Sequence, residues 1–231
     1  MLGKRYVLSA LVLAWLGLSA PLAAAEPAFK ADFEDGKMDG WEPTDANAWK
    51  IEDVEGNKVL CLHKRKSDYK PKVRSPFNIT WLKEPKFASF VLDLKAQSTV
   101  KDYGHRDLCL FFGKQDASHF YYVHMANKAD PHAHSIFAVD GKPRVSIVKE
   151  RTNGVVWGDQ WHHLRIIRDA ENGSIQVFFD DMEKPIMSTT DKRFVEGQIG
   201  VGSFDDTGRF DDLRIYKGTT PPKADGANAT K

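Results

Sequence analysis

Side chains that can move protons are concentrated in one part of the sequence, from Tyr103 to Ser146. Five of the eight histidines fall in this stretch, at positions His105, His119, His124, His132 and His134. An imidazole titrates near neutral pH, with an unperturbed pKa of about 6.5, so it can act as an acid or as a base. Tyrosines lie among these histidines and could donate a further proton or stack on a flat ligand.

The alternation of side chains predicts which of these residues meet. Turn-forming residues divide the stretch into three runs, which we expect to be consecutive antiparallel strands. Every second side chain of a strand points to the same face, and neighbouring strands lie about 4.8 Å apart. One surface is thus expected to carry Asp107, Tyr122, His124 and His134, with His105 and Arg106 at its rim.

Two interpretations of this surface are open. In the first it is an active face that lines an open groove, and its side chains pack little. The catalytic set is then Tyr122, His124 and His134, and the substrate-binding set is His105, Arg106 and Asp107. In the second, the histidines bond backbone carbonyls and the tyrosine packs with its hydroxyl in water. If these residues belong to the core, the basic loop from His63 to Arg74 is the next place to look for a site.

A second group of residues is suited to hold a cation. Asp32 and Glu34 lie in the expected first strand, and Asp211 and Asp212 lie in the expected last strand. First and last strands are commonly neighbours in jelly-roll sandwiches, so these carboxylates would repel one another without a cation between them. Oxygen ligands suit Ca2+, and a structural Ca2+ ion is expected here; the alternative is a set of solvated turn carboxylates.

The elements that must position these residues are expected to be β-strands throughout. Residues 164–168 and 175–179 alternate in polarity on either side of an Asn172-Gly173 turn, which is typical of a hairpin. A second pair of strands is expected at residues 198–203 and 210–216, and helical periodicity is weak after residue 25. This pattern predicts an all-β fold, a two-sheet antiparallel jelly-roll sandwich.

The same region resembles the concanavalin A-like lectin/glucanase (LamG-type jelly-roll) superfamily. The matching motifs are Trp161-His162-His163-Leu164, Ile199-Gly200-Val201-Gly202 and Phe210-Asp211-Asp212-Leu213. The resemblance covers Phe29 to Lys217. It implies a concanavalin A-like sandwich that binds sugars on the concave face of one sheet, often with a structural calcium between the first and last strands. Asp181-Met182 stands where the family has Asp-Gly, so that turn must differ.

The catalytic motifs known in this fold are missing from the chain. The Glu-x-Asp-x-x-Glu strand of laminarinase-like sites is absent. Gln198-Ile199 is followed by Gly200 and not by the histidine of alginate-lyase-like sites. Residues 35–41, Asp-Gly-Lys-Met-Asp-Gly-Trp, are loosely similar to the opening of the bacterial keto-disaccharide hydrolase group, although the Asn-Ser-Gly strand of that group is not visible.

Both ends of the chain are expected to lie outside the sandwich. Residues 1–25 have the basic start, apolar centre and Ala23-Ala24-Ala25 cleavage site of a secretory signal peptide, which predicts a secreted or periplasmic protein. Residues 26–218 then form the sandwich domain. The composition of residues 219–231 predicts a disordered tail.

Charge and cysteine content limit the partners. Loss of Lys4 and Arg5 with the signal changes the formal net charge from +1 to −1, which argues against binding to nucleic acid. The chain lacks the run of about 20 apolar residues that a membrane span needs, and we expect a monomer. Cys61 and Cys109 follow no spacing pattern, so buried free thiols are favoured over a disulfide.

The sequence therefore predicts a secreted sandwich that recognises an oligo- or polysaccharide on its concave sheet. One alternative is a glycan hydrolase or polysaccharide lyase that uses the histidine–tyrosine face. Another is a cell-envelope adhesion or interaction domain. The lack of a familiar carboxylate pair favours binding over catalysis.

Overall fold

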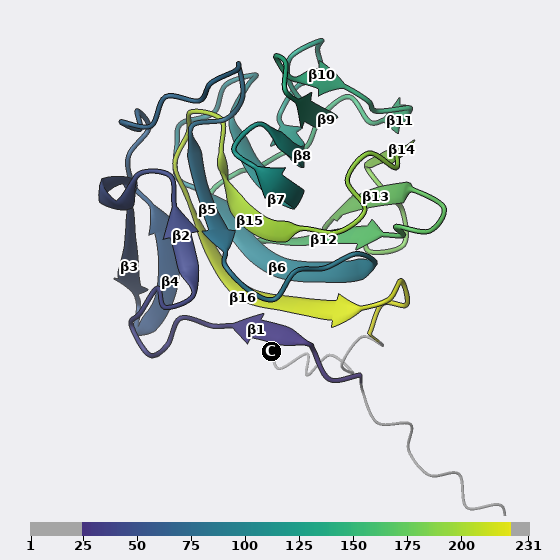
Figure 1. Cartoon of the computed structure of the whole chain (residues 1–231). Coiled ribbons are helices and arrows are strands. Elements are labelled where there is room, and N and C mark those ends of the chain that lie inside the picture. Colours follow the sequence, from purple (N-terminus) through teal and green to yellow (C-terminus); the bar gives the residue numbers. More distant parts are fainter. Residues whose placement is uncertain (1–24, 223–231) are drawn as a thin grey trace, which may run out of the picture.

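Two antiparallel β-sheets form the fold in the computed structural model, which describes residues 25–222 (Figure 1). This confirms the predicted two-sheet sandwich. The expected signal peptide, apart from Ala25, and the expected tail beyond Pro222 lie outside the described residues. Within the described part, no helix is long and apolar enough to cross a membrane.

The larger sheet has nine strands. In spatial order they are β11 (Glu150–Arg151), β14 (Met187–Thr190), β13 (Ser174–Phe179), β12 (His162–Arg168), β6 (Phe90–Ser98), β16 (Gly208–Lys217), β4 (Asn57–Leu62) and β3 (Trp49–Val54), and β1 (Phe29–Ala31) pairs with β16. A short 3-10 turn, η1 (Ala46–Ala48), precedes β3. The predicted hairpin is present, because Leu164 to Arg168 pair with Phe179 to Ile175 around the turn.

The smaller sheet has seven strands and lies over the first. Its order is β10 (Val145–Ser146), β9 (Ser135–Asp140), β8 (His119–Ala126), β7 (Asp107–Asp116), β15 (Gln198–Ser203), β5 (Asn78–Leu82) and β2 (Trp41–Pro43). The stretch rich in histidine and tyrosine supplies β7, β8 and β9, which are consecutive and antiparallel as predicted.

The space between the sheets holds the main core. Leu110, Val123 and Ile136 of the smaller sheet face Leu92 and Ile166 of the larger one, and all are buried. Each of these residues alternates with a neighbour that points the other way, which is the period expected of strands. The apolar area removed from water between the sheets stabilises the sandwich.

The smaller sheet is buried on its second face too, which we call the outer face. Side chains of a second cluster cover it: Ile79, Trp81, Cys109, Phe111, Phe120, Tyr122, Phe137 and Val139. The long loop of residues 63–77 contributes Val73 to this cluster. As a result, almost every residue of β8 is buried, whereas the sequence predicted that one face of this strand would be open.

Glycines on β15 allow the side chains and backbone on the outer face to pack closely against this strand. A Cβ on Gly200 would lie 2.9 Å from the indole of Trp81, and one on Gly202 would lie 1.9 Å from the carbonyl oxygen of Asn78. Neither contact can exist in a packed structure. The alternate glycines in the Ile199-Gly200-Val201-Gly202 motif therefore allow β5 and the Trp81 ring to approach β15 closely.

We expect Gly202→Ala to lower the free energy of unfolding by about 1–3 kcal/mol or more, because the new methyl group would overpack against a backbone carbonyl. Urea unfolding measures the loss. Gly104→Ala is the matched control, since its Cβ would come no closer than 3.8 Å to Lys128. Equal stability of the two variants would contradict the close approach of β5 and β15.

Candidate functional site

The predicted face exists, and three of its residues share it. Cys109 pairs with His124 and Phe111 pairs with Tyr122 across β7 and β8, so Asp107, Tyr122 and His124 all lie on the outer face. The Nε2 atom of His124 is 3.3 Å from Oδ2 of Asp107.

This face is not the open groove that the sequence predicted. Tyr122 and Asp107 are fully buried, and His124 is 3 % exposed. Arg144 of the β9–β10 connection covers them: its Nη1 donates to the Tyr122 hydroxyl at 2.6 Å, and its guanidinium lies over the rings of Phe137 and Phe204. A ligand in solvent cannot reach Tyr122 or His124 in this arrangement. Their truncation should therefore cost packing energy, contrary to the expectation for groove residues.

A hydrogen-bond network holds the polar end of the outer face. The Asp107 carboxylate accepts from the Ser203 hydroxyl at 3.1 Å, from the Phe204 amide at 3.1 Å and from the Cys109 thiol at 3.1 Å. Burial raises the pKa of Asp107, but the neighbouring His124 and the hydrogen bonds from Cys109 and Phe204 outweigh it, and the net shift is downward. Burial and the neighbouring Asp107 charge raise the pKa of the Cys109 thiol and bring that of Asp206 to about 6.

The other predicted residues of this face lie elsewhere. His134 is buried with a positive φ of 50°, and its Nε2 is 2.9 Å from the Thr152 hydroxyl, so it does not face Tyr122. Arg106 is 2 % exposed and bonds Ser98 and the Gly158 carbonyl, so its placement at an open rim was wrong. His105 is exposed, and its Nε2 pairs with Asp130.

The four residues predicted to share a calcium ion do not converge. Asp212 forms an ion pair with Lys95 at 2.6 Å, while Asp211 accepts from the Asn57 amide at 3.0 Å. Glu34 accepts from the Lys58 backbone amide, and Asp32 is 3.4 Å from the Glu34 amide. Cations and amides of the chain thus already meet these carboxylates. Calcium at this edge stays a prediction from the sequence.

A pocket of about 150 Å3 opens on the outer face, at the end away from Arg144. Its walls include Trp81 of β5, Phe120 and Lys114 of the β7–β8 hairpin, Tyr69 of the long loop, and Glu42 of β2. The Lys114 ammonium lies 4.8 Å from the Trp81 ring centre, and burial lowers the pKa of Lys114. Hydrophobic and charged groups therefore face the same small space.

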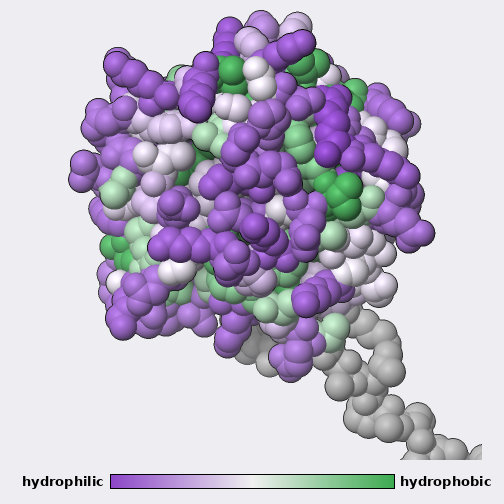
Figure 2. Space-filling view, in the orientation of Figure 1, coloured by the Kyte–Doolittle hydropathy of each residue, from purple (hydrophilic) through white to green (hydrophobic). Residues whose placement is uncertain are grey.

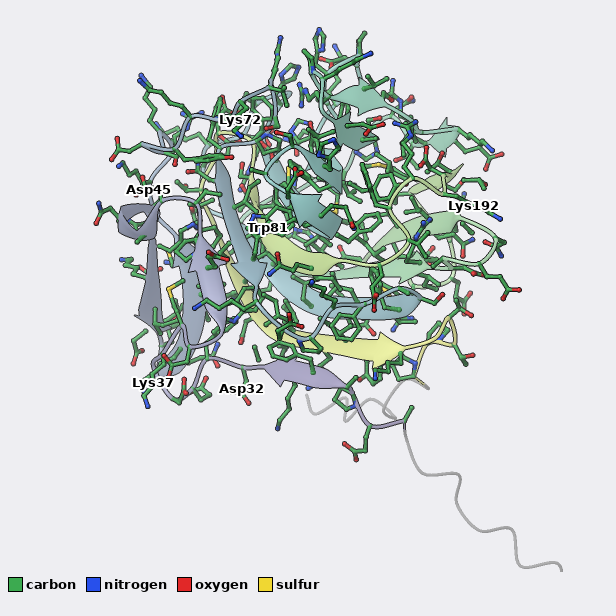
Figure 3. The ribbon with its side chains drawn as sticks, in the orientation of Figure 1. Asp32, Lys37, Asp45, Lys72, Trp81 and Lys192 are labelled. Carbon is green, nitrogen blue, oxygen red and sulfur yellow. The ribbon has the colours of Figure 1, made fainter. Side chains whose placement is uncertain are left out.

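A basic groove of about 540 Å3 adjoins this pocket through Tyr69. It is lined by cationic residues of the long loop, Arg65, Lys66, Lys70, Lys72 and Arg74. Figure 3 shows Lys72 on this loop near the top of the view and Trp81 on β5 below it. In Figure 2, which has the orientation of Figure 1, hydrophilic residues cover most of the visible face.

The sequence indicated this loop only as an alternative site, and nothing in the spacing of residues pointed to Trp81. The sequence feature that points to the pocket is the concentration of six Lys and Arg residues around Tyr69, within residues 63–74. An aromatic residue in a basic loop suits a ligand that is both flat and acidic.

A hollow of about 380 Å3 on the larger sheet is a weaker candidate. Three of its charged groups are already paired with one another: Arg165 donates two hydrogen bonds to Asp93 at 2.7 and 2.9 Å, and His163 lies 3.0 Å from the same carboxylate. These pairs leave fewer free groups for a ligand than the basic groove does.

The buried imidazole of His134 should make the stability of the folded protein depend on pH. Burial, then the charges of Arg151 and His124, lower its pKa from 6.5 to about 4. The unfolded chain therefore binds a proton at pH values where the folded protein keeps this imidazole neutral. The stability that His134 contributes is complete above about pH 6.5 and is lost as the pH falls toward 4, by on the order of 3 kcal/mol.

We expect His134→Asn to flatten the acid side of the stability profile, since asparagine tolerates the positive φ and does not titrate. Urea unfolding at pH 7 and pH 4.5 measures it: the wild type should lose more stability on acidification than the variant. His63→Asn replaces an exposed histidine and should follow the wild type. Parallel profiles for wild type and His134→Asn would show that His134 does not titrate as described.

Comparison with known proteins identifies the fold. No family model and no curated protein matches the chain. Carbohydrate binding module CBM66 from Bacillus subtilis superposes with a TM-score of 0.55 at 18% identity, over 78% of this chain and 98% of the module. Domain 4 of AbnA, a GH43 extracellular arabinanase from Geobacillus stearothermophilus, reaches 0.56 at 15% identity, over 86% and 96%. Lectin I-B4 from Griffonia simplicifolia reaches 0.51 at 12% identity, over 80% and 95%. The chain thus has a jelly-roll sandwich like those of concanavalin A-like and galectin-like proteins.

Proposed function

We propose that this protein binds a glycan at the Trp81 pocket and that the basic loop selects glycans that carry acidic groups. The observation that supports this most directly is the junction of the two spaces: Tyr69 lines both the aromatic pocket and the basic groove. A chain of sugar rings that enters the pocket would continue along the loop.

The pocket offers the groups that a sugar ring needs. Pyranose rings present C–H faces that stack on aromatic side chains, and the half-buried Tyr69 and the largely buried Trp81 both line the pocket. Hydroxyl groups need donors and acceptors at the margin. The Lys114 ammonium can donate, and the exposed Glu42 carboxylate can accept.

The basic loop adds charge selectivity. Among the described residues, no carboxylate lies within ion-pair distance of Lys66, Lys70 or Lys72, in contrast to Lys64, which pairs with Asp45 and Asp68. These unpaired ammonium groups can attract carboxylate or sulfate groups of a polysaccharide without first breaking an internal pair. The near-neutral net charge does not oppose this, because screening makes the local charge decisive at contact distance.

The structural neighbours support binding to sugars. One is named as a carbohydrate binding module, and another was solved in complex with arabinotriose. Secretion, through the expected signal peptide, would place the protein where polysaccharides occur. The resemblance of residues 35–41 to the keto-disaccharide hydrolase group would imply hydrolysis, but the predicted catalytic residues Tyr122 and His124 are closed off from solvent. We therefore propose recognition and no reaction.

We expect Lys70→Glu with Lys72→Glu to weaken binding of an oligogalacturonate at least ~10-fold, equivalent to ~1.4 kcal/mol, because two attractive charges become repulsive. Binding of the carboxyl-reduced neutral oligosaccharide of the same length should stay unchanged. Tyr69→Ala should weaken both ligands, since ring stacking does not depend on ligand charge. Isothermal titration calorimetry at two salt concentrations separates the contributions.

Lys184→Glu with Lys192→Glu is the matched control for the charge reversal. Both lysines are exposed, and Lys192 lies at the right of Figure 3, away from Lys72. This control should bind as the wild type does. Equal weakening by the two double variants, or no binding of either oligosaccharide by the wild type in a wider glycan array, would contradict the proposed function.

A further inference from the structure

Three potential metal ligands lie together at the polar end of the outer face, apart from the Trp81 pocket. They are Asp107, Cys109 and His124, and one ligand atom from each lies within 4.8 Å of the others. In the described part of the chain, no other three His, Cys, Asp or Glu side chains meet this condition. All three residues are buried, so solvent does not compete for their ligand atoms.

The strand register brings these ligands together. Cys109 of β7 lies directly opposite His124 of β8. Asp107 precedes Cys109 by two residues and therefore points to the same face. Both strands are central in the sheet, so the three groups are held on a rigid support, as a metal site requires.

The hydrogen bond on the far side of His124 decides which nitrogen is free. Nδ1 lies 3.2 Å from the carbonyl oxygen of His132, and because a carbonyl only accepts, Nδ1 must carry a hydrogen. In the neutral imidazole, Nε2 then holds a bare lone pair. A metal-bound histidine typically has this arrangement, with its other nitrogen donating to a carbonyl.

The free nitrogen faces groups that cannot satisfy it. Nε2 of His124 is buried without a hydrogen-bond partner, although Oδ2 of Asp107 is 3.3 Å away. The distance is short enough for an ion pair, but the atoms are not aligned for a hydrogen bond. A lone pair and a carboxylate oxygen side by side in a dry site repel each other unless a positive charge is shared between them.

The spacing and chemistry of the group suit one ion. The Cys109 sulfur lies 3.1 Å from Asp107 Oδ2, and bonds of about 2.0–2.3 Å in a tetrahedral site place neighbouring ligands about 3.3–3.8 Å apart, so small shifts would suffice. The Ser203 hydroxyl and the Phe204 amide already orient the Asp107 carboxylate, as supporting groups do around bound metals.

We propose that Asp107, Cys109 and His124 bind one Zn2+ ion. Mixed nitrogen, oxygen and sulfur ligands are those of zinc, whereas Ca2+ takes six to eight oxygens. Binding forms the zinc–sulfur bond as the Cys109 thiol loses its proton to solvent. One thiolate, one carboxylate and a neutral imidazole then balance the two positive charges, so the buried site is neutral overall. The competing occupant is a proton, which would make His124 an imidazolium paired with Asp107.

Metal content and cobalt spectroscopy distinguish the two occupants. The mature chain, without a histidine tag, is refolded with Zn2+ or Co2+, because burial would slow loading of the folded protein. After gel filtration, the wild type should retain about one zinc ion per chain. The Co2+ form should show a thiolate-to-cobalt charge-transfer band in the near ultraviolet, which arises only from a cobalt–sulfur bond.

Cys61 provides a matched control, since it is the second free buried cysteine and lies on β4 of the other sheet. Cys61→Ser should keep both the zinc and the band. Cys109→Ser should lose the band, and His124→Gln should bind zinc at least ~100-fold more weakly, a loss larger than that of supporting groups around a metal.

A wild type that refolds with metal but retains no zinc and shows no charge-transfer band overturns the proposal, and this result depends on no variant folding. Retention of the band in Cys109→Ser, or its loss in Cys61→Ser, also overturns it, because the thiolate would then come from elsewhere. The zinc test is independent of the glycan test, since the Trp81 pocket contains none of the three ligands.

Discussion

Burial of the smaller sheet on both faces is the constraint on which the rest of this structure depends. The inner face packs against the larger sheet, as in any sandwich. The outer face carries a second apolar cluster that must also be removed from water, and the loop of residues 63–77, together with Arg144, covers it. The Arg74 carbonyl accepts from the Arg144 amide at 3.0 Å, so the two parts of the cover are joined by a backbone hydrogen bond.

This cover divides the outer face into two regions with different properties. Under Arg144, the polar end around Asp107 is closed, and every charge there must be met by a hydrogen bond or an opposite charge. At the β2 and β5 side the cover ends, and the gap between Tyr69 and Trp81 stays open as the pocket. The basic residues of the loop point away from the apolar cluster and line the groove beside it. A structural need, to cover a second apolar face, thus also produces the surface suited to an acidic glycan.

The closed region shows why burial changes the interpretation of a reactive residue. His124 and Asp107 lie side by side as an acid–base pair would, but without access to solvent they cannot meet a soluble substrate. The same low dielectric strengthens their interaction with any cation held between them. His124 and Asp107, which the sequence placed on an active face, are therefore better suited, once buried, to hold an ion.

The sequence by itself determined the fold class, the hairpin at Asn172-Gly173 and the shared face of Asp107, Tyr122 and His124. These follow from local rules: the two-residue period of strands and the turn preferences of Asn and Gly. Free cysteines at positions 61 and 109 were also predicted and are present. Arg106 was misplaced because alternation gives the face of a side chain but not what packs against it; its guanidinium finds carbonyl partners in distant segments.

Only the tertiary structure decided which faces are open. Whether Tyr122 meets water depends on Arg144, 22 residues away along the chain, and on the loop of residues 63–77. Likewise, the Trp81 pocket combines side chains from β2, β5, the β7–β8 hairpin and the long loop, segments with no shared periodicity. Alternation along one strand is a local property, whereas burial is the sum of contacts from segments far apart in sequence, so the position of the proposed site followed from the packing alone.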